Sequence, residues 1–201
     1  ETARILGHQI IEDYPFLEGV QPVTNDPKEA YLNRSWRPTV SYTGIDGIPS
    51  LDQAGNVLRP RTAIGLSIRL PPTADDEAVV AELKQIFETN PPYGAKVTFT
   101  CNKHAPGFYA PPLENWLADS VNTASKTLWG KPAAFESCGG SIPILNLLRE
   151  KFPQAQFLPA GVLGPKSNAH AQNEFLHIGY FYNLVTVVSK VIADHHVAKS
   201  Q

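Results

Sequence analysis

The chain has 201 residues, of which 42% are hydrophobic and 18% are charged, and its formal net charge is −2 at pH 7. This composition is too apolar for a disordered protein, and it lacks the basic surplus of nucleic-acid-binding proteins. No apolar run reaches the ~20 residues that a membrane-spanning helix needs, so we expect neither nucleic acid nor membrane as a partner. Two cysteines do not make a disulfide framework, and we expect free thiols in a cytoplasmic protein.

The first 35 residues are weakly patterned. Apolar residues between positions 5 and 11 predict one short helical face, and a helical turn is expected at 28–33, after the Asn25-Asp26-Pro27 turn. The chain contains no methionine and begins at Glu1 without the features of a signal peptide. We therefore expect that further residues precede Glu1 in the natural protein.

The next part of the chain has a clear period of two. Apolar and polar residues alternate in three segments, which predicts strands, and the clean alternation at 61–70 predicts that this strand is half-buried. An amphipathic helix separates the second segment from the third. We expect a small α+β layer, with one sheet and helices on one face. The elements predicted here are strands at 39–43, 61–70 and 96–101, and a helix that begins after Thr73 or Asp75 and ends before Pro91.

Beyond a proline-rich junction at 105–112, helical stripes replace the alternation. Helices and short strands alternate there, which predicts α/β layering, and Gly130 is expected to end the first helix. The predicted elements are helices at 113–129, 141–152 and 178–195, strands at 133–135 and 156–159, and a loop at 161–173.

A glycine-rich loop at 136–144 is the first candidate for chemistry. Gly139 and Gly140 lie between a predicted strand and a predicted helix, where exposed N–H groups at a helix N-terminus can bind an anion. The alternative is an ordinary strand-to-helix turn with Ser141 as the helix cap. The pattern by itself favours that alternative, because glycine-rich turns are common.

A histidine in a polar loop is the second candidate. His170 is flanked by amides and a carboxylate, in a kind of loop where functional residues concentrate. Zinc needs three or four ligands, and no second His or Asp stands here at metal-binding spacing, so the partners of this candidate ligand stay open. His177 is the nearest alternative, but packing or solvation at a helix start explains it. His195 and His196 are expected to be solvated.

Four segments, in the same order along the chain, resemble one enzyme family. The chain resembles the C-terminal half of the co-catalytic zinc metallopeptidases, which include carnosinase-type dipeptidases, glutamate carboxypeptidases, aminoacylases and acetylornithine deacetylase. The resemblance covers about residues 30–195. The segments are Trp36-Arg37-Pro38-Thr39-Val40, Asn56-Val57-Leu58-Arg59-Pro60 with Ile68-Arg69-Leu70, Gly139-Gly140-Ser141-Ile142-Pro143 and Ala169-His170-Ala171-Gln172-Asn173-Glu174.

The resemblance implies an α/β and α+β fold in two parts. Residues 1–107 would be part of a ferredoxin-like lid (dimerisation) domain with an N-terminal extension, and residues 108–201 the C-terminal part of an α/β zinc-peptidase catalytic domain. The lid implies a homodimer. Because part of a domain leaves sheet edges and apolar faces uncovered, we expect either unusually exposed apolar surface or oligomer contacts that cover it.

The resemblance also implies roles for single residues. His170 would be a zinc ligand, and Arg69 would grip the C-terminal carboxylate of the substrate through bidentate hydrogen bonds. Alternation places Arg69 on the polar face of its strand, as that role requires, although an ordinary exposed charge is the alternative. Gly139, Gly140 and Ser141 would line the substrate pocket with backbone donors.

Asn56 would lie on a loop that reaches into the active site of the neighbouring subunit, where it would help to stabilise the tetrahedral oxyanion. A Gly-Asn turn explains the residue equally well. Two positions depart from the family pattern. Ala171 replaces a small polar residue, and Cys138 stands where an acidic residue often precedes the glycines, which leaves the substrate contacts of that loop open.

The implied function is hydrolysis of a peptide amide bond, in a dipeptide or at a peptide C-terminus, by a water that two zinc ions activate. The family's His-x-Asp pair and its Glu-Glu pair, which contains the general base, are absent from these residues, and helix capping explains Asp75-Asp76. We therefore expect this polypeptide to be inert and to bind zinc weakly. Alternatives are a deacylase of N-acyl amino acids, as in the acetylornithine deacetylase branch, and a non-catalytic binding or dimerisation module.

Overall fold

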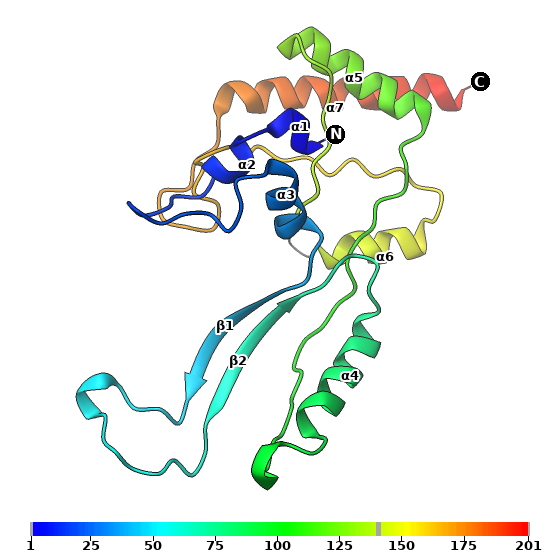
Figure 1. Ribbon diagram of the computed structural model, residues 1–201. Helices are drawn as coiled ribbons and strands as arrows, with labels where there is room; N and C mark the ends of the chain where they lie inside the picture. The colour runs from blue at the N-terminus through cyan, green and yellow to red at the C-terminus, as the bar shows by residue number, and fades with distance from the viewer. Residues whose placement is uncertain (1, 140–141, 201) are drawn as a thin grey trace. The chain divides into compact units, whose positions relative to one another are not determined.

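The computed structural model describes residues 2–139 and 142–200, and the chain divides into two compact units (Figure 1). The first, called the helical unit, consists of Glu1–Tyr31, Tyr109–Ser137 and Leu147–Gln201. The second, called the hairpin unit, consists of Leu32–Phe108 and Cys138–Asn146. The first 31 residues therefore group with most of the second half of the chain, and the short segment Cys138–Asn146 groups with Leu32–Phe108.

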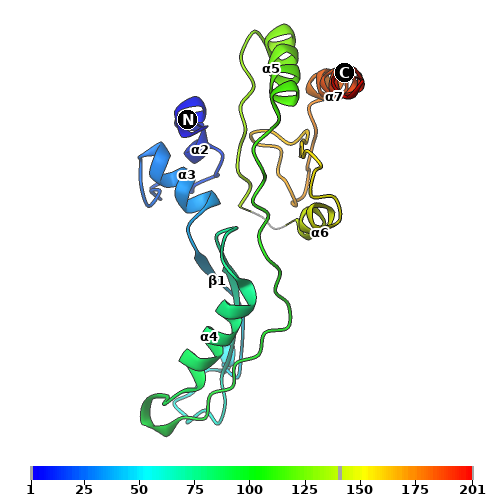
Figure 2. The ribbon, with the colours of Figure 1, turned by 90° about the vertical axis from the view of Figure 1, so that its right-hand side faces the viewer.

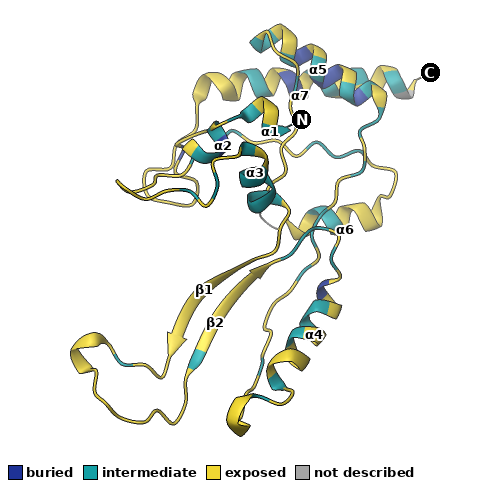
Figure 3. Cartoon of the chain, viewed as in Figure 1, coloured by how far each residue is buried: buried dark blue, intermediate teal, exposed yellow. Residues whose placement is uncertain are grey.

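The sheet of the hairpin unit is an antiparallel pair, β1 (Thr39–Asp46) and β2 (Ala63–Arg69). Thr39 pairs with Arg69, and the register shifts after Tyr42, where a bulge interrupts the ladder. Both predicted strands are confirmed, but the half-burial expected of the second is wrong, because most of β2 is exposed, as is all of β1 (Figure 3). Within the described residues, no layer covers either face of this pair closely enough to exclude water.

Helix α4 (Asp76–Glu88) follows β2, as the amphipathic pattern predicts. Asp75, and not Thr73, is its N-cap, because the carboxylate of Asp75 accepts a hydrogen bond from the N–H of Ala78 at 3.0 Å. The cap satisfies one of the N–H groups that a helix start leaves without an intrahelical partner.

The third predicted strand, at 96–101, is wrong. This segment packs along α4, where the rings of Phe87 and Phe99 stack with centroids 5.7 Å apart and planes 12° apart. The N–H of Phe99 donates to a carboxylate oxygen of Glu88 at 2.8 Å. Alternation predicts an extended chain with one apolar face, but a strand also needs a neighbouring strand to bond with. Here the apolar face packs against a helix instead, and a side chain accepts the hydrogen bond of the backbone N–H.

The core of the helical unit lies between α5 (Asn115–Trp129) and α7 (Ile178–Lys199), which lie side by side (Figure 2). Both helices are confirmed, and Gly130 ends α5 in the left-handed conformation, with φ 67°. The contact excludes water from one stripe of each helix and so stabilises their association. The buried apolar residues of this pair are Leu117, Val121, Ala124 and Val187.

Shorter helices complete the described elements. Gly7, with φ 55°, separates the first two, which together make the helical face expected near the N-terminus. Neither 133–135 nor 156–159 forms the predicted strand, because these apolar runs find no ladder partner within the described residues. The remaining helices are α1 (Thr2–Leu6), α2 (Gln9–Glu12), α3 (Pro27–Ser35) and α6 (Pro143–Lys151), and 3-10 turns occur at Leu51–Gln53 and Pro92–Gly94.

The chain exposes an unusually large surface. Its solvent-accessible area is 15660 Å². A compact monomer of the same mass, 22.0 kDa, exposes about 9,300 Å². Apolar side chains contribute to this area, and Val23 and Leu58 are each 99% exposed. The expectation of exposed apolar surface is therefore confirmed, and none of the helices described is long and apolar enough to cross a membrane.

Candidate functional site

The loop that carries His170 is folded back on itself by short hydrogen bonds. The hydroxyl of Ser167 accepts from the N–H of Gly164 at 2.8 Å and donates to the carbonyl of the same residue at 2.7 Å. The N–H of Phe175 donates to the Ser167 carbonyl at 3.1 Å, which closes the far side of the loop. Ser167 is 3% exposed, so this small polar residue is the buried centre of the loop.

The backbone of this loop enters the left-handed region at four residues that are not glycine: Lys166, Asn168, His170 and Asn173, with φ between 54° and 64°. Asn tolerates that region because its short side chain forms local hydrogen bonds, whereas for Lys and His the left-handed conformation costs roughly 1 kcal/mol or more of free energy. Unfavourable backbone angles of this kind cluster at functional sites, where the surrounding structure maintains them.

His170 is fixed by the carboxylate at the end of the same loop. The N–H of His170 donates to Oε2 of Glu174 at 3.0 Å, and the histidine has a φ of 63°. A hydrogen bond to an ionised carboxylate is roughly twice as strong as one between neutral groups. The sequence predicts a polar loop around His170, but it does not predict that Glu174 contacts the backbone of the histidine.

The described residues do not fit a complete metal centre. In residues 2–139 and 142–200, no group of three or more His, Cys, Asp or Glu side chains is arranged to hold a metal ion. Zinc sites in proteins use three or four protein ligands, and one imidazole falls short of that number. His170 therefore does not belong to a complete set of metal ligands among these residues.

The glycine-rich loop is described only in part, because Gly140 and Ser141 lie outside the described residues. Gly139 is required where it stands, since a Cβ at this position would collide with the backbone carbonyl oxygen of Arg34. Helix α6 begins at Pro143, which fits the first turn because proline has no N–H to leave unpaired.

Arg69 and Asn56 both belong to the exposed hairpin. Arg69 is the last residue of β2, its side chain is exposed, and it forms no ion pair with the described part of the chain. Asn56 is the central residue of a tight turn, in which the N–H of Val57 donates to the carbonyl of Gly55 at 2.9 Å. The turn that the sequence predicts is therefore present, and the side chain of Asn56 is exposed at it.

The candidate residues are divided between the units. Arg69, Asn56 and Gly139 belong to the hairpin unit, and His170 belongs to the helical unit. Two other histidines of the helical unit, His177 and His195, have structural contacts. His177 is the N-cap of α7, where its Nδ1 accepts from the N–H of Tyr180 at 3.0 Å, and the ring of His195 contacts that of Trp116 at 5.2 Å.

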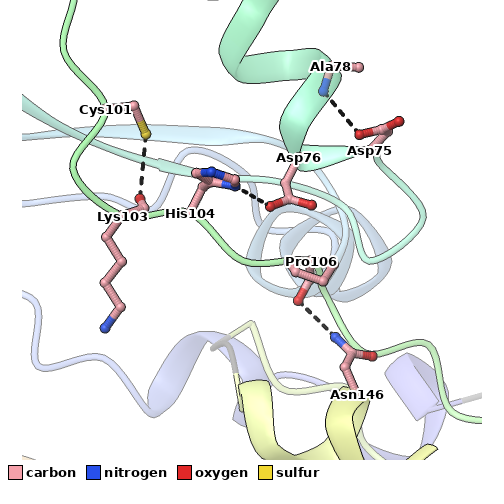
Figure 4. A network of polar contacts seen from close by, with 8 residues as sticks. All are labelled: Asp75, Asp76, Ala78, Cys101, Lys103, His104, Pro106 and Asn146. Carbon is pink, nitrogen blue, oxygen red and sulfur yellow. Dashed lines mark hydrogen bonds and ion pairs between the residues drawn. The ribbon is translucent and has the colours of Figure 1, made fainter. Parts of the chain in front are cut away.

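A polar network in the hairpin unit was not predicted from the sequence (Figure 4). Nδ1 of His104 lies 2.6 Å from Oδ2 of Asp76, a residue that is only 9% exposed, so capping does not explain both residues of the acidic doublet. Nearby, Asn146 donates to the carbonyl of Pro106 at 2.9 Å. The signal in the sequence that could have found this contact is the place of Asp76 in the first turn of an amphipathic helix. If that place is buried, the carboxylate needs a partner.

No protein-family profile matches the chain. It is 26% identical over 174 residues to the cysteinylglycine-S-conjugate dipeptidase of Corynebacterium striatum, covering 81% of this chain and 36% of the relative. It is 28% identical over 162 residues to the Cys-Gly metallodipeptidase dug1 of Schizosaccharomyces pombe, covering 78% of this chain and 33% of the relative. The chain thus spans about a third of the length of these curated relatives.

The fold has a counterpart among solved structures. The M20 family metallo-carboxypeptidase Sso-CP2 of Sulfolobus solfataricus aligns with a TM-score of 0.65 and 18% identity, over 95% of this chain and 41% of that one. This likeness confirms the fold class expected from the sequence, a mixed α/β and α+β arrangement that corresponds to part of such a protein. In sequence the chain is related to Cys-Gly dipeptidases and in fold to an M20-family metallopeptidase, and it covers part of each.

Proposed function

We propose that the chain is part of a zinc-dependent metallopeptidase that hydrolyses the amide bond of a dipeptide or of a C-terminal residue. The observation that carries this proposal is the likeness to Cys-Gly dipeptidases over about four-fifths of the chain. Because those relatives are named as dipeptidases, a peptide is a better candidate substrate than an N-acyl amino acid.

Within this proposal, His170 contributes one zinc ligand, and zinc, when bound, supplies an activated water. The exposed guanidinium of Arg69 binds the substrate's C-terminal carboxylate, for which its planar fork of donors is suited. We assign no general base to this chain. We therefore expect the 201 residues by themselves to bind a dipeptide weakly and not to hydrolyse it.

Further contacts in the proposal come from the two loops of the hairpin unit. Backbone N–H groups of Gly139, Gly140 and Ser141 donate to the substrate, and Asn56 of a second copy stabilises the oxyanion. This role for Asn56 includes a homodimer formed through the hairpin unit. The exposure of Asn56 at its turn supports the role, because a buried side chain would not reach another subunit.

The first test is turnover. Purified 201-residue chain is incubated with Cys-Gly and with an N-acyl amino acid, each with added zinc and with a chelator. We expect no product in any arm. Chelator-sensitive hydrolysis of Cys-Gly by the chain alone would contradict the statement that this chain contains no general base. Hydrolysis of the N-acyl amino acid alone would instead favour the deacylase class of enzyme.

The second test is recognition of the carboxylate. Chemical-shift changes are measured by NMR on titration with a dipeptide and with the same dipeptide amidated at its C-terminus. We expect changes around Arg69 with the free acid only, and their loss in Arg69→Ala. Arg61→Ala is the matched control, because Arg61 is exposed on the same hairpin and pairs with Asp46 at 3.6 Å. Equal binding of the amide, or an equal effect of Arg61→Ala, would overturn the role of Arg69.

A further inference from the structure

The position of His170 depends on two residues that do not share its proposed role. In the loop 164–175, Ser167 holds the incoming backbone at Gly164, and Glu174 holds the outgoing backbone at His170. Because the His170 backbone has a φ of 63°, it occupies a conformation that an L-residue leaves unless other contacts maintain it. The two contacts therefore have a specific task, which is to hold that conformation.

Ser167 is suited to this task by its size and its burial. Its hydroxyl is both acceptor and donor to Gly164, at 2.8 and 2.7 Å, and its own N–H donates to the Gly164 carbonyl at 3.2 Å. The residue is 3% exposed, and removal of its hydroxyl would take away the acceptor of the Gly164 N–H and one of the two donors to the Gly164 carbonyl. The side chain is too enclosed to contact a substrate directly.

Glu174 acts from the other side of the loop. Its Oε2 accepts the N–H of His170 at 3.0 Å, a bond that spans four residues and closes the turn containing the histidine. The same N–H would otherwise face solvent, because both residues are exposed. A glutamine would keep an acceptor oxygen at this place, whereas alanine would remove it.

We propose that Ser167 and Glu174 are positioning residues that keep His170 in its left-handed backbone conformation and thereby set the direction in which its imidazole is presented. The importance of this direction for metal binding rests on the proposed function. The conformational statement does not, and it can be tested on the 201-residue chain without any ligand.

The test measures exchange of the His170 amide with water by NMR, together with the amide-to-Hα NOE within His170, which is strong at positive φ. The variants are Ser167→Ala, Glu174→Ala and Glu174→Gln. We expect Ser167→Ala and Glu174→Ala to speed exchange by about tenfold or more and to weaken the NOE, and Glu174→Gln to restore most of both. Ser189→Ala is the control, because its hydroxyl bonds to the Val185 carbonyl within α7.

Unchanged exchange and an unchanged NOE in both alanine variants would overturn the proposal. If the buried Ser167→Ala variant loses the resonance dispersion of α5 and α7, the exposed Glu174→Ala variant by itself decides between the two results. Failure of Glu174→Gln to restore the NOE would also count against positioning through the hydrogen bond. A negative result for dipeptide binding at Arg69 would leave these measurements standing, so the two proposals fail separately.

Discussion

The imidazole of His104 lies against the carboxylate of Asp76, with 2.6 Å between Nδ1 and Oδ2, although 28 positions separate the two residues in the chain. The side chain of Asp76 is 12% exposed and that of His104 is 42% exposed, so the carboxylate relies on the imidazole more than the reverse. The contact holds the extended segment after Cys101 against the first turn of α4 (Figure 4). It stands in for the hydrogen bonds to a neighbouring strand that this segment does not make.

Removal of the imidazole should therefore destabilise the hairpin unit. In His104→Ala, the mostly buried carboxylate of Asp76 loses its partner, and we expect the free energy of unfolding to fall by about 1 to 2 kcal/mol. Urea unfolding, together with hydrogen exchange of the α4 amides, measures the change. Lys103→Ala is the neighbouring control and should stay within about 0.5 kcal/mol of the natural chain. A loss no larger than that of the control would refute the anchoring role.

The packing of residues 96–101 on α4 should weaken in acid. The hydrogen bond from the Phe99 N–H is the largest cause that holds the pKa of Glu88 below its usual value. Desolvation opposes it, and the charge and hydrogen bond of Lys84 are smaller causes that lower the pKa further. A carboxyl group whose pKa is lower in the folded state stabilises that state above its unfolded pKa, and this contribution is lost as the pH falls through the folded pKa.

The Phe99 amide resonance reports this titration directly. We expect its shift to follow a midpoint below the ordinary value of a glutamate carboxyl, and we expect Glu88→Gln to abolish the transition. A midpoint at or above the ordinary glutamate value would show that the carboxylate does not accept the Phe99 N–H in solution.

Gly139 should tolerate no side chain. An alanine Cβ would collide with the Arg34 carbonyl oxygen, so the Cys138–Asn146 segment or the end of α3 must shift. We expect Gly139→Ala to cost about 1 to 3 kcal/mol in urea unfolding. Gly161→Ala is the matched control, because a Cβ there meets no atom within 4 Å, and this variant should be neutral or slightly stabilising. Equal stability of the two variants would contradict the close approach.

Lys166 should be replaceable by glycine with a gain in stability. Its φ of 64° costs a lysine roughly 1 kcal/mol that glycine does not pay, so Lys166→Gly should stabilise the loop by up to about that amount. Asn168→Gly should gain less, because asparagine tolerates this region at its φ of 54°. Thermal unfolding of the three chains checks the order, and a larger gain at Asn168 would reverse the argument.

Local features were predictable where neighbouring residues determine them. Period-two alternation places β1 and β2, and the helix stripes place α5 and α7, because each pattern is a property of consecutive residues. The same holds for a helix cap at Thr73 or Asp75, of which the structure uses Asp75, and for Gly130 as a helix end, since caps act within one turn of the helix. The strand expected at 96–101 fails for the complementary reason, because a strand depends on a partner elsewhere in the chain.

By itself, then, the sequence determined the mixed class of the fold, the positions of its long helices and its hairpin, and the resemblance that singled out His170. Only the tertiary structure decided which distant groups meet. In the folded chain, the imidazole of His104 contacts the carboxylate of Asp76, and the Phe99 N–H donates to Glu88. His170 lies in a loop centred on the buried Ser167. The physical reason is that buried or strained polar groups are satisfied by whatever the folded chain brings within hydrogen-bond distance, and local pattern does not contain that information.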